Sequence, residues 1–356
     1  MKIIVITYNK YKTGGIEQVA NNIVNSLNDS HDVQLIAIDD FKLIKSGVFS
    51  QIFNRVLLNI KIKRYIKKLS PDILISMHPF LLARISLINR SFKLITWVHG
   101  IDVFGINGIK HKENLEKSDK IIAVSNFTKN HLINDLAYKG GNIEVINNCV
   151  DIETFQYTRP SKHINELKLL TIGRLSSNEQ YKGHDLVIKS INKTKEYTKQ
   201  IIKYTIVGDG DDRERLEALV EKEKVERFVI FTGKVSFKEL LEEYRKCDVF
   251  IMPSFFKKKS DGTFTGEGFG IVYVEAGAIG RPVIGCTIGG QTDCIIDGFN
   301  GKLVNPDTND IAEKIAAFAN NDDDRKKMGK NNRKLVEEKF TFDSFKSNVV
   351  KLIKEI

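Results

Sequence analysis

Few cysteines, no membrane-length apolar run and no repeat are the first features of this 356-residue sequence. Its four cysteines (Cys149, Cys247, Cys286 and Cys294) lack CxxC or CxxH spacing. A zinc site is therefore not expected, and the thiols are predicted to be free and buried in a reducing cytosol. No stretch reaches the roughly 18 apolar residues that cross a bilayer. Low-complexity tracts and short solenoid repeats are also missing.

The length and the first residues predict a two-domain protein that begins with a strand. A chain of this size is too long for one ordinary core and suits two domains of about 150–180 residues. The start, MKIIVITYNK, is a short apolar run that soon turns polar. It predicts a first β-strand rather than a signal peptide. We therefore expect a cytoplasmic protein.

Apolar runs of strand length alternate with helical patterns along the whole sequence, which predicts an α/β fold with parallel sheets covered on both faces. Two of the intervening patterns predict amphipathic helices over Gly15–Leu27 and Arg55–Leu69. The predicted strands are KIIVITY, VQLIAID, PDILISMH, KLITWVHG, KIIAVS and IEVINN, then LKLLTIGR, IKYTIVGDG, RFVIFTG, CDVFIMPS and PVIG.

The strand rhythm restarts near residue 165, so we predict two Rossmann-like domains. The first covers residues 1–160 and the second residues 166–339, joined by the polar linker Glu153–Glu166. Residues 340–356 predict a C-terminal helix that returns to the first domain. Ligands of such sheets bind beyond the carboxyl ends of the strands, so we expect a site in a cleft where these ends face each other.

Positive charge is concentrated in the first half. Residues 1–165 hold 22 Lys and Arg against 14 Asp and Glu, whereas the remainder holds 33 against 31. A basic half beside a nearly neutral half indicates that one domain faces something anionic, either nucleic acid or a membrane surface.

Two glutamates flank the predicted start of a helix in TGEGFGIVYVEAGAIGRPVIG. Glu267 and Glu275 are eight positions apart, and a helix is expected to begin at about Phe269–Gly270. Its free backbone N–H groups favour a ligand with a phosphate and several hydroxyls. The alternative is that Glu267 caps the helix and Glu275 is a solvated residue on it.

Cations follow the strand LKLLTIG. Arg174 offers bidentate contacts to a phosphate, and Lys182 adds a compact second charge. Together they suit a diphosphate leaving group, although a surface pair of this kind is often only solvated.

Other candidate positions are weaker. Gly14 and Gly15 precede a predicted helix and let backbone approach an anion, but no GxGxxG is present, which disfavours a nicotinamide dinucleotide. Asp209 and Asp211 form a DxD that would suit a metal, yet they open a helix and are interpreted as capping it. His99 ends a strand and is either structural or functional.

Together these motifs resemble the retaining GT-B glycosyltransferases, the large family that includes sucrose synthases and bacterial phosphatidylinositol mannosyltransferases. The most specific part is the E-x7-E motif, Glu267-GFGIVYV-Glu275. The supporting motifs occur in the expected order over nearly the whole chain: GGIE, WVHG, AVSNFTK, IGR…KG, VGDG, FTGKV and GRPVIG…GGQTDCIIDGFNGKLV.

The resemblance implies a role for each matching position. Glu267 would lie by the donor sugar, Glu275 would bind the ribose hydroxyls, and Arg174 and Lys182 would stabilise the departing diphosphate. The remaining implied contacts are the backbone of Phe269, Gly270 and Ile271 to sugar and phosphates, Val235 to the base, Gly15 to the phosphate and His99 to the sugar on the acceptor side.

Three departures from the family pattern are visible. Cys149 replaces the usual glycine in VINNCVD, and Gln291 and Asp293 stand where many relatives have a proline–glutamate pair. Arg174 and Lys182 are eight positions apart, which is longer than the common spacing. The SSNEQY loop between them is therefore able to move Lys182 away from the position that the family pattern gives it.

The expected function is transfer of a sugar from a UDP- or GDP-sugar to a hydroxyl of a glycan or lipid-linked acceptor, with retained anomeric configuration, in bacterial surface polysaccharide synthesis. No metal or cofactor is expected, because cations and a helix N-terminus already face the diphosphate. A sugar-nucleotide 2-epimerase or hydrolase of the same fold is the alternative. A nucleic-acid-binding protein is disfavoured, since no recognition helix or aromatic–basic platform is present.

The helix Arg55–Leu69 carries much of the excess charge. Its pattern predicts an apolar stripe of Leu58, Ile62, Tyr65, Ile66 and Leu69, with the cations on the other side. It is either an ordinary core-packing helix or also a contact to an anionic leaflet. The second reading places the enzyme peripherally at the inner face of the plasma membrane.

Overall fold

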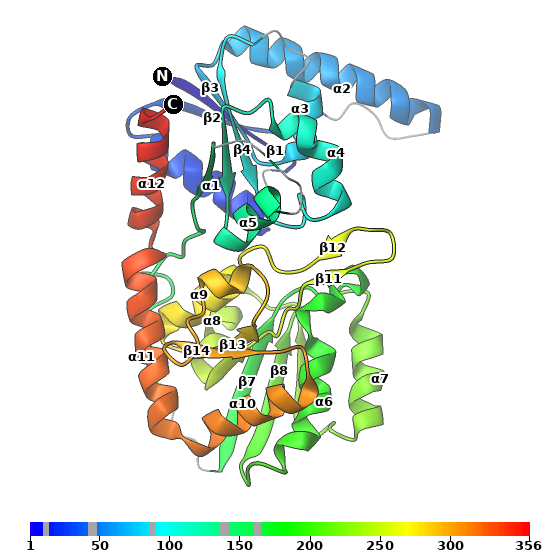
Figure 1. Cartoon of the computed structure of the whole chain (residues 1–356), viewed down its shortest axis with the longest axis vertical. Helices are drawn as coiled ribbons and strands as arrows, with labels where there is room; N and C mark the ends of the chain where they lie inside the picture. The colour runs from blue at the N-terminus through cyan, green and yellow to red at the C-terminus, as the bar shows by residue number, and fades with distance from the viewer. Residues whose placement is uncertain (10–13, 42–47, 86–89, 135–137, 139–141, 160–164) are drawn as a thin grey trace. The chain divides into compact units, whose positions relative to one another are not determined.

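The computed structural model describes residues 1–9, 14–41, 48–85, 90–134, 138, 142–159 and 165–356. It divides the chain into two compact units. Unit 1 consists of Met1–Asn148 with Phe342–Ile356, and unit 2 of Cys149–Thr341. Each unit contains a six-stranded parallel sheet with helices on its faces (Figure 1), and unit 2 also contains a short antiparallel two-stranded sheet. The predicted α/β architecture with two Rossmann-like domains is confirmed.

Unit 1 has the strand order β2-β1-β3-β4-β5-β6. Its core is built from the apolar strands, with Ile4, Ile6 and Leu74 almost completely buried. Its elements are β1 (Lys2–Thr7), α1 (Gly15–Leu27), β2 (Asp32–Ala37), η1 (Ile38–Phe41), α2 (Val48–Leu69), β3 (Ile73–Ser76), α3 (Pro79–Ile85), β4 (Lys93–Val98), α4 (Ile106–Leu115), β5 (Lys120–Ala123), α5 (Asn126–Asn134), β6 (Ile143–Val145) and α12 (Phe342–Lys354).

Unit 2 has the order β14-β13-β10-β7-β8-β9. Its elements are β7 (Glu166–Ile172), η2 (Ser177–Lys182), α6 (His184–Thr194), β8 (Ile201–Val207), α7 (Arg213–Glu223), β9 (Val229–Gly233), α8 (Phe237–Lys246), β10 (Val249–Ile251), β11 (Lys257–Lys258), β12 (Phe264–Thr265), α9 (Ile271–Ile279), β13 (Val283–Cys286), η3 (Gly290–Asp293), β14 (Gly301–Val304), α10 (Thr308–Asn320) and α11 (Asp322–Lys339).

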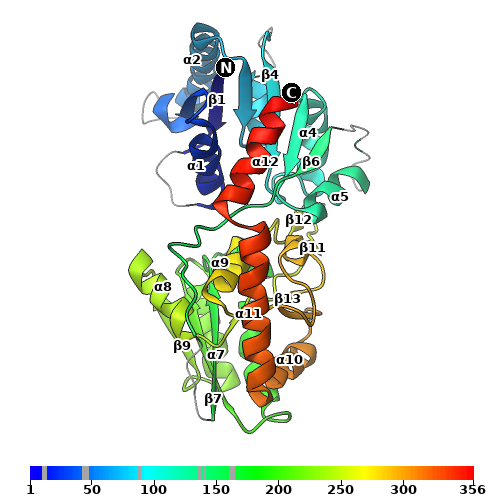
Figure 2. The same cartoon turned by 90° about the vertical axis from the view of Figure 1, so that its left-hand side faces the viewer.

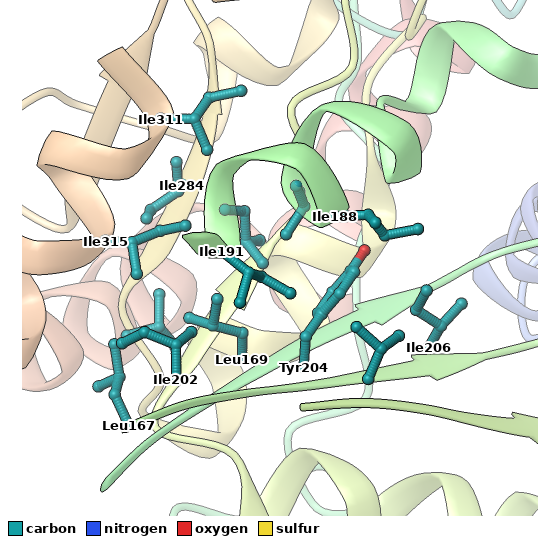
Figure 3. Close-up of a cluster of buried hydrophobic side chains, with 14 of the residues drawn as sticks. Leu167, Leu169, Ile188, Ile191, Ile202, Tyr204, Ile206, Ile284, Ile311 and Ile315 are labelled. Atoms are coloured by element: carbon teal, nitrogen blue, oxygen red, sulfur yellow. The ribbon is translucent and has the colours of Figure 1, made fainter. Parts of the chain in front are cut away.

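The core of unit 2 lies between its sheet and the helices α6 and α10. Figure 3 shows Leu167 and Leu169 of β7 and Tyr204 of β8 on the side of the sheet where Ile188 and Ile191 of α6 lie. Burying each such aliphatic side chain contributes about 1.5–3 kcal/mol. This packing fixes β7, and with it the carboxyl end from which the candidate site begins.

The boundary between the units differs from the prediction. The sequence predicted a first domain of residues 1–160, but residues from Cys149 onwards belong to unit 2. Val150 N donates to Phe340 O (2.9 Å), and Thr158 N donates to Ile279 O (3.1 Å). A polar segment without a period therefore becomes part of unit 2 through backbone hydrogen bonds, which composition does not reveal.

Helix α12 belongs to unit 1, where it lies beside α1 (Figure 2). Its buried face carries Phe345, Val349, Leu352 and Ile353. The ring of Phe345 lies 6.2 Å from that of Trp97 in β4, measured between centroids. The last 15 residues thus complete the core of the unit that begins the chain.

Individual elements depart from the sequence pattern in three places. Helix α2 begins at Val48, seven residues before the predicted Arg55. The strands β11, β12 and β14 were not predicted, and β11 and β12 are only two residues long. Tyr65, assigned to the apolar stripe of α2, is 38% exposed, whereas Ile62 and Ile66 are buried as predicted.

Candidate active site

The site residues of unit 2 gather where the strand order reverses. The strands β7 and β10 are neighbours in the sheet. The strand that follows β7 in the chain, β8, lies on one side of this pair, and the next strand of the sheet after β10, β13, lies on the other. Arg174 and Lys182 follow β7, and Glu267 follows β10. Such a switch point at the carboxyl ends of parallel strands is the usual ligand position in doubly wound sheets.

One carboxylate joins the two predicted cations. Lys182 Nζ lies 2.6 Å from Glu179 Oε2, and Arg174 Nη2 donates to the other oxygen, Oε1. Lys182 packs over Gly173, where a Cβ would lie 3.2 Å from its Nζ. The long SSNEQY loop therefore does not separate Arg174 from Lys182, because both contact Glu179.

The loop that carries Glu179 is held in place on both sides. Ser177 N donates to Asp211 Oδ1 (3.0 Å), and Gln180 Nε2 donates to Asp212 Oδ1 (3.0 Å). Asp211 thus ties the loop to the segment before α7. The interpretation of Asp209 and Asp211 as caps of α7 is wrong, since the N-cap residue is Asp212, which makes no side-chain cap hydrogen bond.

Glu267 lies directly before α9 and within electrostatic range of Lys182. Burial raises the pKa of its carboxyl group, and the charge of Lys182 and hydrogen bonds from the backbone of Gly268 and Phe269 oppose this shift. The helix then starts at Ile271 with Gly270 as its N-cap, at φ 87°. A Cβ at Gly270 would meet the Tyr273 ring at 2.5 Å and Glu267 Cγ at 3.2 Å, so glycine is required there.

The segment before α9 has a rigid support. Gly290 N donates to Glu267 O (2.8 Å), and a Cβ at Gly290 would collide with Gly268 O. Nε2 of the buried Gln291 lies within hydrogen-bond distance of three carbonyl oxygens, those of Ser254, Cys286 and Ile288, which share its two N–H groups. Gln291, noted as a departure from the family pattern, therefore ties the loop after β10 to the loop after β13.

Glu275 is oriented by a tyrosine of a neighbouring helix. Its Oε2 accepts a hydrogen bond from Tyr244 Oη (2.6 Å) in α8. Burial raises the pKa of Glu275, and the Tyr244 hydrogen bond opposes the shift. The alternative that Glu275 is merely a solvated residue is therefore wrong, because the side chain is part-buried and hydrogen-bonded. Tyr244 was missed by sequence reasoning, since the motif contains no sign of a residue 31 positions away.

The structure places Val235 and Phe269, two residues expected to contact the donor, but their surroundings do not define a role for either. Val235 lies between β9 and α8 and is partly exposed. Phe269 is buried, and its ring lies 5.8 Å from that of Phe340. A contact of Val235 with a base remains a prediction.

In unit 1, three rings gather at carboxyl ends of its strands. Tyr8 follows β1, His78 follows β3 and His99 follows β4. The ring centroids of Tyr8 and His78 are 5.1 Å apart, and those of His78 and His99 are 5.8 Å apart. Here too the strand order reverses between β1 and β3, so His99 lies near a typical ligand position.

The polar cluster around His99 also contains Asp102, which holds the turn after β4. His99 N donates to Asp102 Oδ1 (2.9 Å), and Asp102 Oδ2 is 3.9 Å from His78 Nδ1. Burial lowers the pKa of His99 to about 3 and that of His78 to about 4. Burial raises the pKa of Asp102 to about 7. His99 is thus a neutral imidazole at pH 7. His78 and Asp102 were not singled out from the sequence. Each follows a predicted strand, His78 at the end of PDILISMH and Asp102 in the HGID stretch after KLITWV.

Gly15 is the first residue of α1 and follows the N-cap residue Gly14. An added Cβ at Gly15 would meet no atom within 4 Å, so its position at the open start of a helix is compatible with an approaching anion.

Three further properties hold for the described residues. No cluster of three or more His, Cys, Asp or Glu side chains among them is arranged to hold a metal ion. None of their helices combines the length and the apolarity that crossing a membrane requires. All four cysteines are free and buried, as predicted.

Comparisons with known proteins place the sequence in a family. The model of the glycosyl transferases group 1 matches residues 156–335, and that of Glycosyltransferase Family 4 matches residues 13–154. An uncharacterized glycosyltransferase of Methanocaldococcus jannaschii is 30% identical over 274 residues, which cover 74% of this chain and 68% of the relative. Two further glycosyltransferases of that organism are covered over 56% and 45% of their length.

Solved structures agree in fold. The Anabaena protein HepE, in complex with UDP and glucose, has a TM-score of 0.79 at 18% identity, with both chains covered completely. The lipopolysaccharide outer core galactosyltransferase WaaB has a TM-score of 0.78 at 22% identity, over 100% of this chain and 99% of WaaB. The chain therefore belongs to the glycosyl transferases group 1 family and is a glycosyltransferase with the GT-B fold.

Proposed function

We propose that the protein moves a hexosyl group from a UDP- or GDP-sugar to a hydroxyl of a lipid-linked glycan, with retention of the anomeric configuration. The observation that carries this proposal is the grouping of Arg174, Lys182 and Glu267 at the switch point of unit 2, beside the N-terminus of α9. Cations and backbone N–H groups there suit a diphosphate. HepE, a protein of the same fold, has been solved with UDP and glucose bound.

The proposed chemistry is assisted departure of the nucleoside diphosphate. Lys182 and Arg174 neutralise the negative charge that develops on the leaving group, and α9 adds its N-terminal N–H groups. Glu267 stabilises the positive charge that develops on the sugar, while Glu275, oriented by Tyr244, binds the ribose hydroxyls in ground and transition states alike. We assign His99 to the sugar on the acceptor side, Gly15 to the phosphate and Val235 to the base.

The acceptor proposal is supported by charge. The first half of the sequence holds most of the positive excess. The galactosyltransferase WaaB, named for the lipopolysaccharide outer core, shares the fold. We therefore propose a role in bacterial surface polysaccharide synthesis at the cytoplasmic face of an anionic membrane.

The proposal is tested first by ligand protection. UDP, GDP and the corresponding hexose donors are screened for a rise in the unfolding temperature, because a ligand that binds only the folded state stabilises it. Lys182→Ala should remove the protection, since loss of one partner of a part-buried charged contact costs about 2–5 kcal/mol. Arg174→Ala should weaken the protection by less, because the side chain of Arg174 is exposed. Protection that survives both substitutions would contradict the diphosphate site.

Turnover then separates the two glutamates. Glu267→Gln should lower turnover with little change in donor affinity, whereas Glu275→Ala should mainly weaken donor binding. Product analysis by NMR distinguishes transfer with retention from release of free sugar or of an epimer.

Activity should persist in EDTA, and a complete loss that manganese restores would instead assign Asp209 and Asp211 to a metal.

A further inference from the structure

Glu179 contacts both Arg174 and Lys182, but the proposed chemistry gives it no role. Both of its carboxylate oxygens are engaged, Oε1 by Arg174 and Oε2 by Lys182. The side chains of Glu179 and Lys182 are only 15% and 11% exposed, while that of Arg174 is 79% exposed. The carboxylate therefore lies where the two cations converge, which is the position that the proposed function gives to the diphosphate.

The fold, rather than the ion pairs, places Glu179 there. Its backbone breaks the η2 helix with φ −116° and ψ 25°. Glu179 N donates to Ser176 O (2.8 Å), and the residues on both sides are tied to Asp211 and Asp212. Its carboxylate is thus presented to the cations by a fixed loop.

The two cations are already balanced by carboxylates before a ligand binds. Glu179 and Glu267 both lie within electrostatic range of Lys182, so two carboxylates face two cations. A diphosphate brings at least two more negative charges to the same cations. The diphosphate is unable to bind Arg174 and Lys182 while Glu179 is paired with both. The reason is that its negative charges and the carboxylate would repel strongly at such distances in a part-buried site.

We propose that Glu179 is an internal competitor of the diphosphate: it holds Arg174 and Lys182 together, yields them to the donor, and takes them back as the nucleoside diphosphate leaves. This inference rests on the proposed function. Arg174, as the exposed partner, is free to turn outward with the ligand, while Lys182 stays packed over Gly173. The consequence is weaker binding and faster release of the product.

The test measures the dissociation constants of UDP, GDP and inorganic pyrophosphate by calorimetry for the wild type and Glu179→Gln. Glutamine keeps the shape and one acceptor oxygen but removes the charge. We expect binding to become tighter by about tenfold, equivalent to about 1.4 kcal/mol, with a slower dissociation rate. Glu179→Ala, which also removes the acceptor, should likewise bind more tightly. Glu196→Gln, an equal charge change just beyond the far end of α6, is the control and should bind like the wild type.

The outcomes separate this inference from the function on which it rests. If Lys182→Ala abolishes binding but neither Glu179 variant binds more tightly, Glu179 is no competitor and the diphosphate site stands. Weaker binding by both Glu179 variants would assign it to positioning of the cations instead. If the wild type binds none of the three probes, or Lys182→Ala binds them normally, the diphosphate site itself is wrong and the competitor role falls with it.

Discussion

Glu275 acquires its orientation from a residue that no local motif contains. Tyr244 Oη donates to one carboxylate oxygen of Glu275, which fixes the orientation of that side chain. A carboxylate held in this way loses less conformational entropy when it binds a ligand. Tyr244 is therefore a positioning residue for the proposed ribose contact.

Replacing Tyr244 by Phe should weaken UDP or GDP binding by about fivefold, since one hydrogen bond contributes about 1 kcal/mol. Calorimetric titration measures the change. Tyr204→Phe is the matched control, because Tyr204 is an equally buried tyrosine whose hydroxyl donates to Thr171 Oγ1 (2.8 Å) instead. An equal loss of affinity in both variants would mean that Tyr244 acts only through stability.

Asp102 is a buried carboxyl group whose pKa is raised to about 7, compared with 3.8 in the unfolded chain. Between these values the folded state binds more protons than the unfolded state, so this group lowers stability as pH rises from about 4 to about 7. Asp102→Asn removes the effect while its side-chain oxygen is still able to accept from His99 N.

The variant should therefore gain stability over the wild type with rising pH, by up to about 1.4 kcal/mol per pH unit inside that window. Denaturant unfolding at pH 5 and pH 8 measures the two differences. His78 and His99 titrate in both proteins, and their lowered pKa values act in the opposite direction, which is why only the difference between the proteins is diagnostic. A difference that is the same at both pH values would contradict the raised pKa.

Helix α2 combines a buried stripe with a cationic face. Ile62 and Ile66 are buried, and Leu58 and Leu69 pack against the same core. Lys61, Arg64 and Lys68 are exposed, and no ion pair between described residues includes them. The core role of α2 is thus established, and contact of its exposed cations with an anionic surface remains a prediction.

Reversing Lys61, Arg64 and Lys68 to glutamate should abolish salt-sensitive binding to vesicles containing phosphatidylglycerol, because each cation near such a surface contributes about 1 kcal/mol. Flotation at low salt measures binding, and circular dichroism checks that the fold persists. The same reversal of Lys327, Lys330 and Lys334, exposed on α11, is the control. Equal binding of the wild type to neutral vesicles, or none at low salt, would favour a soluble acceptor.

The whole chain is organised so that its two ends meet in unit 1. Helix α12 packs on α1 and places Phe345 near Trp97, the single tryptophan of the sequence. Fluorescence of Trp97 therefore reports on unit 1 alone. Residues that lie far apart in sequence share one core, so damage at the C-terminus is expected to unfold the N-terminal unit.

Phe345→Ala should lower the free energy of unfolding of unit 1 by about 3–5 kcal/mol, the usual cost of truncating a buried phenylalanine. Urea titration followed by Trp97 fluorescence measures it. Lys346→Ala is the control, since it removes only a 2.7 Å pair with the exposed Asp29, and exposed pairs contribute little to stability. A Trp97 transition unchanged by Phe345→Ala would show that α12 is dispensable for unit 1.

The amino-acid sequence by itself determined the α/β class, most of the strands, the family and the position of the E-x7-E helix. These features depend on apolar periodicity, on glycines with special backbone angles and on short spacings, all of which are local. The spacing of the motif predicted the start of α9 within one or two residues. The structure adds the reason for the glycine before it, because Gly270 has a positive φ and a Cβ there would meet Tyr273 and Glu267.

Tertiary structure alone decided which distant residues meet. The contact of Tyr244 with Glu275, the three carbonyls held by Gln291 and the transfer of Cys149 onwards to unit 2 all join segments that the pattern treats as separate. Glu179 is the sharpest case, because its loop looked like an insertion that would separate Arg174 from Lys182, yet its carboxylate joins them. Periodicity and spacing encode which face a residue takes within its own element, whereas the partner of a charge depends on which strands and loops the folded sheet brings side by side.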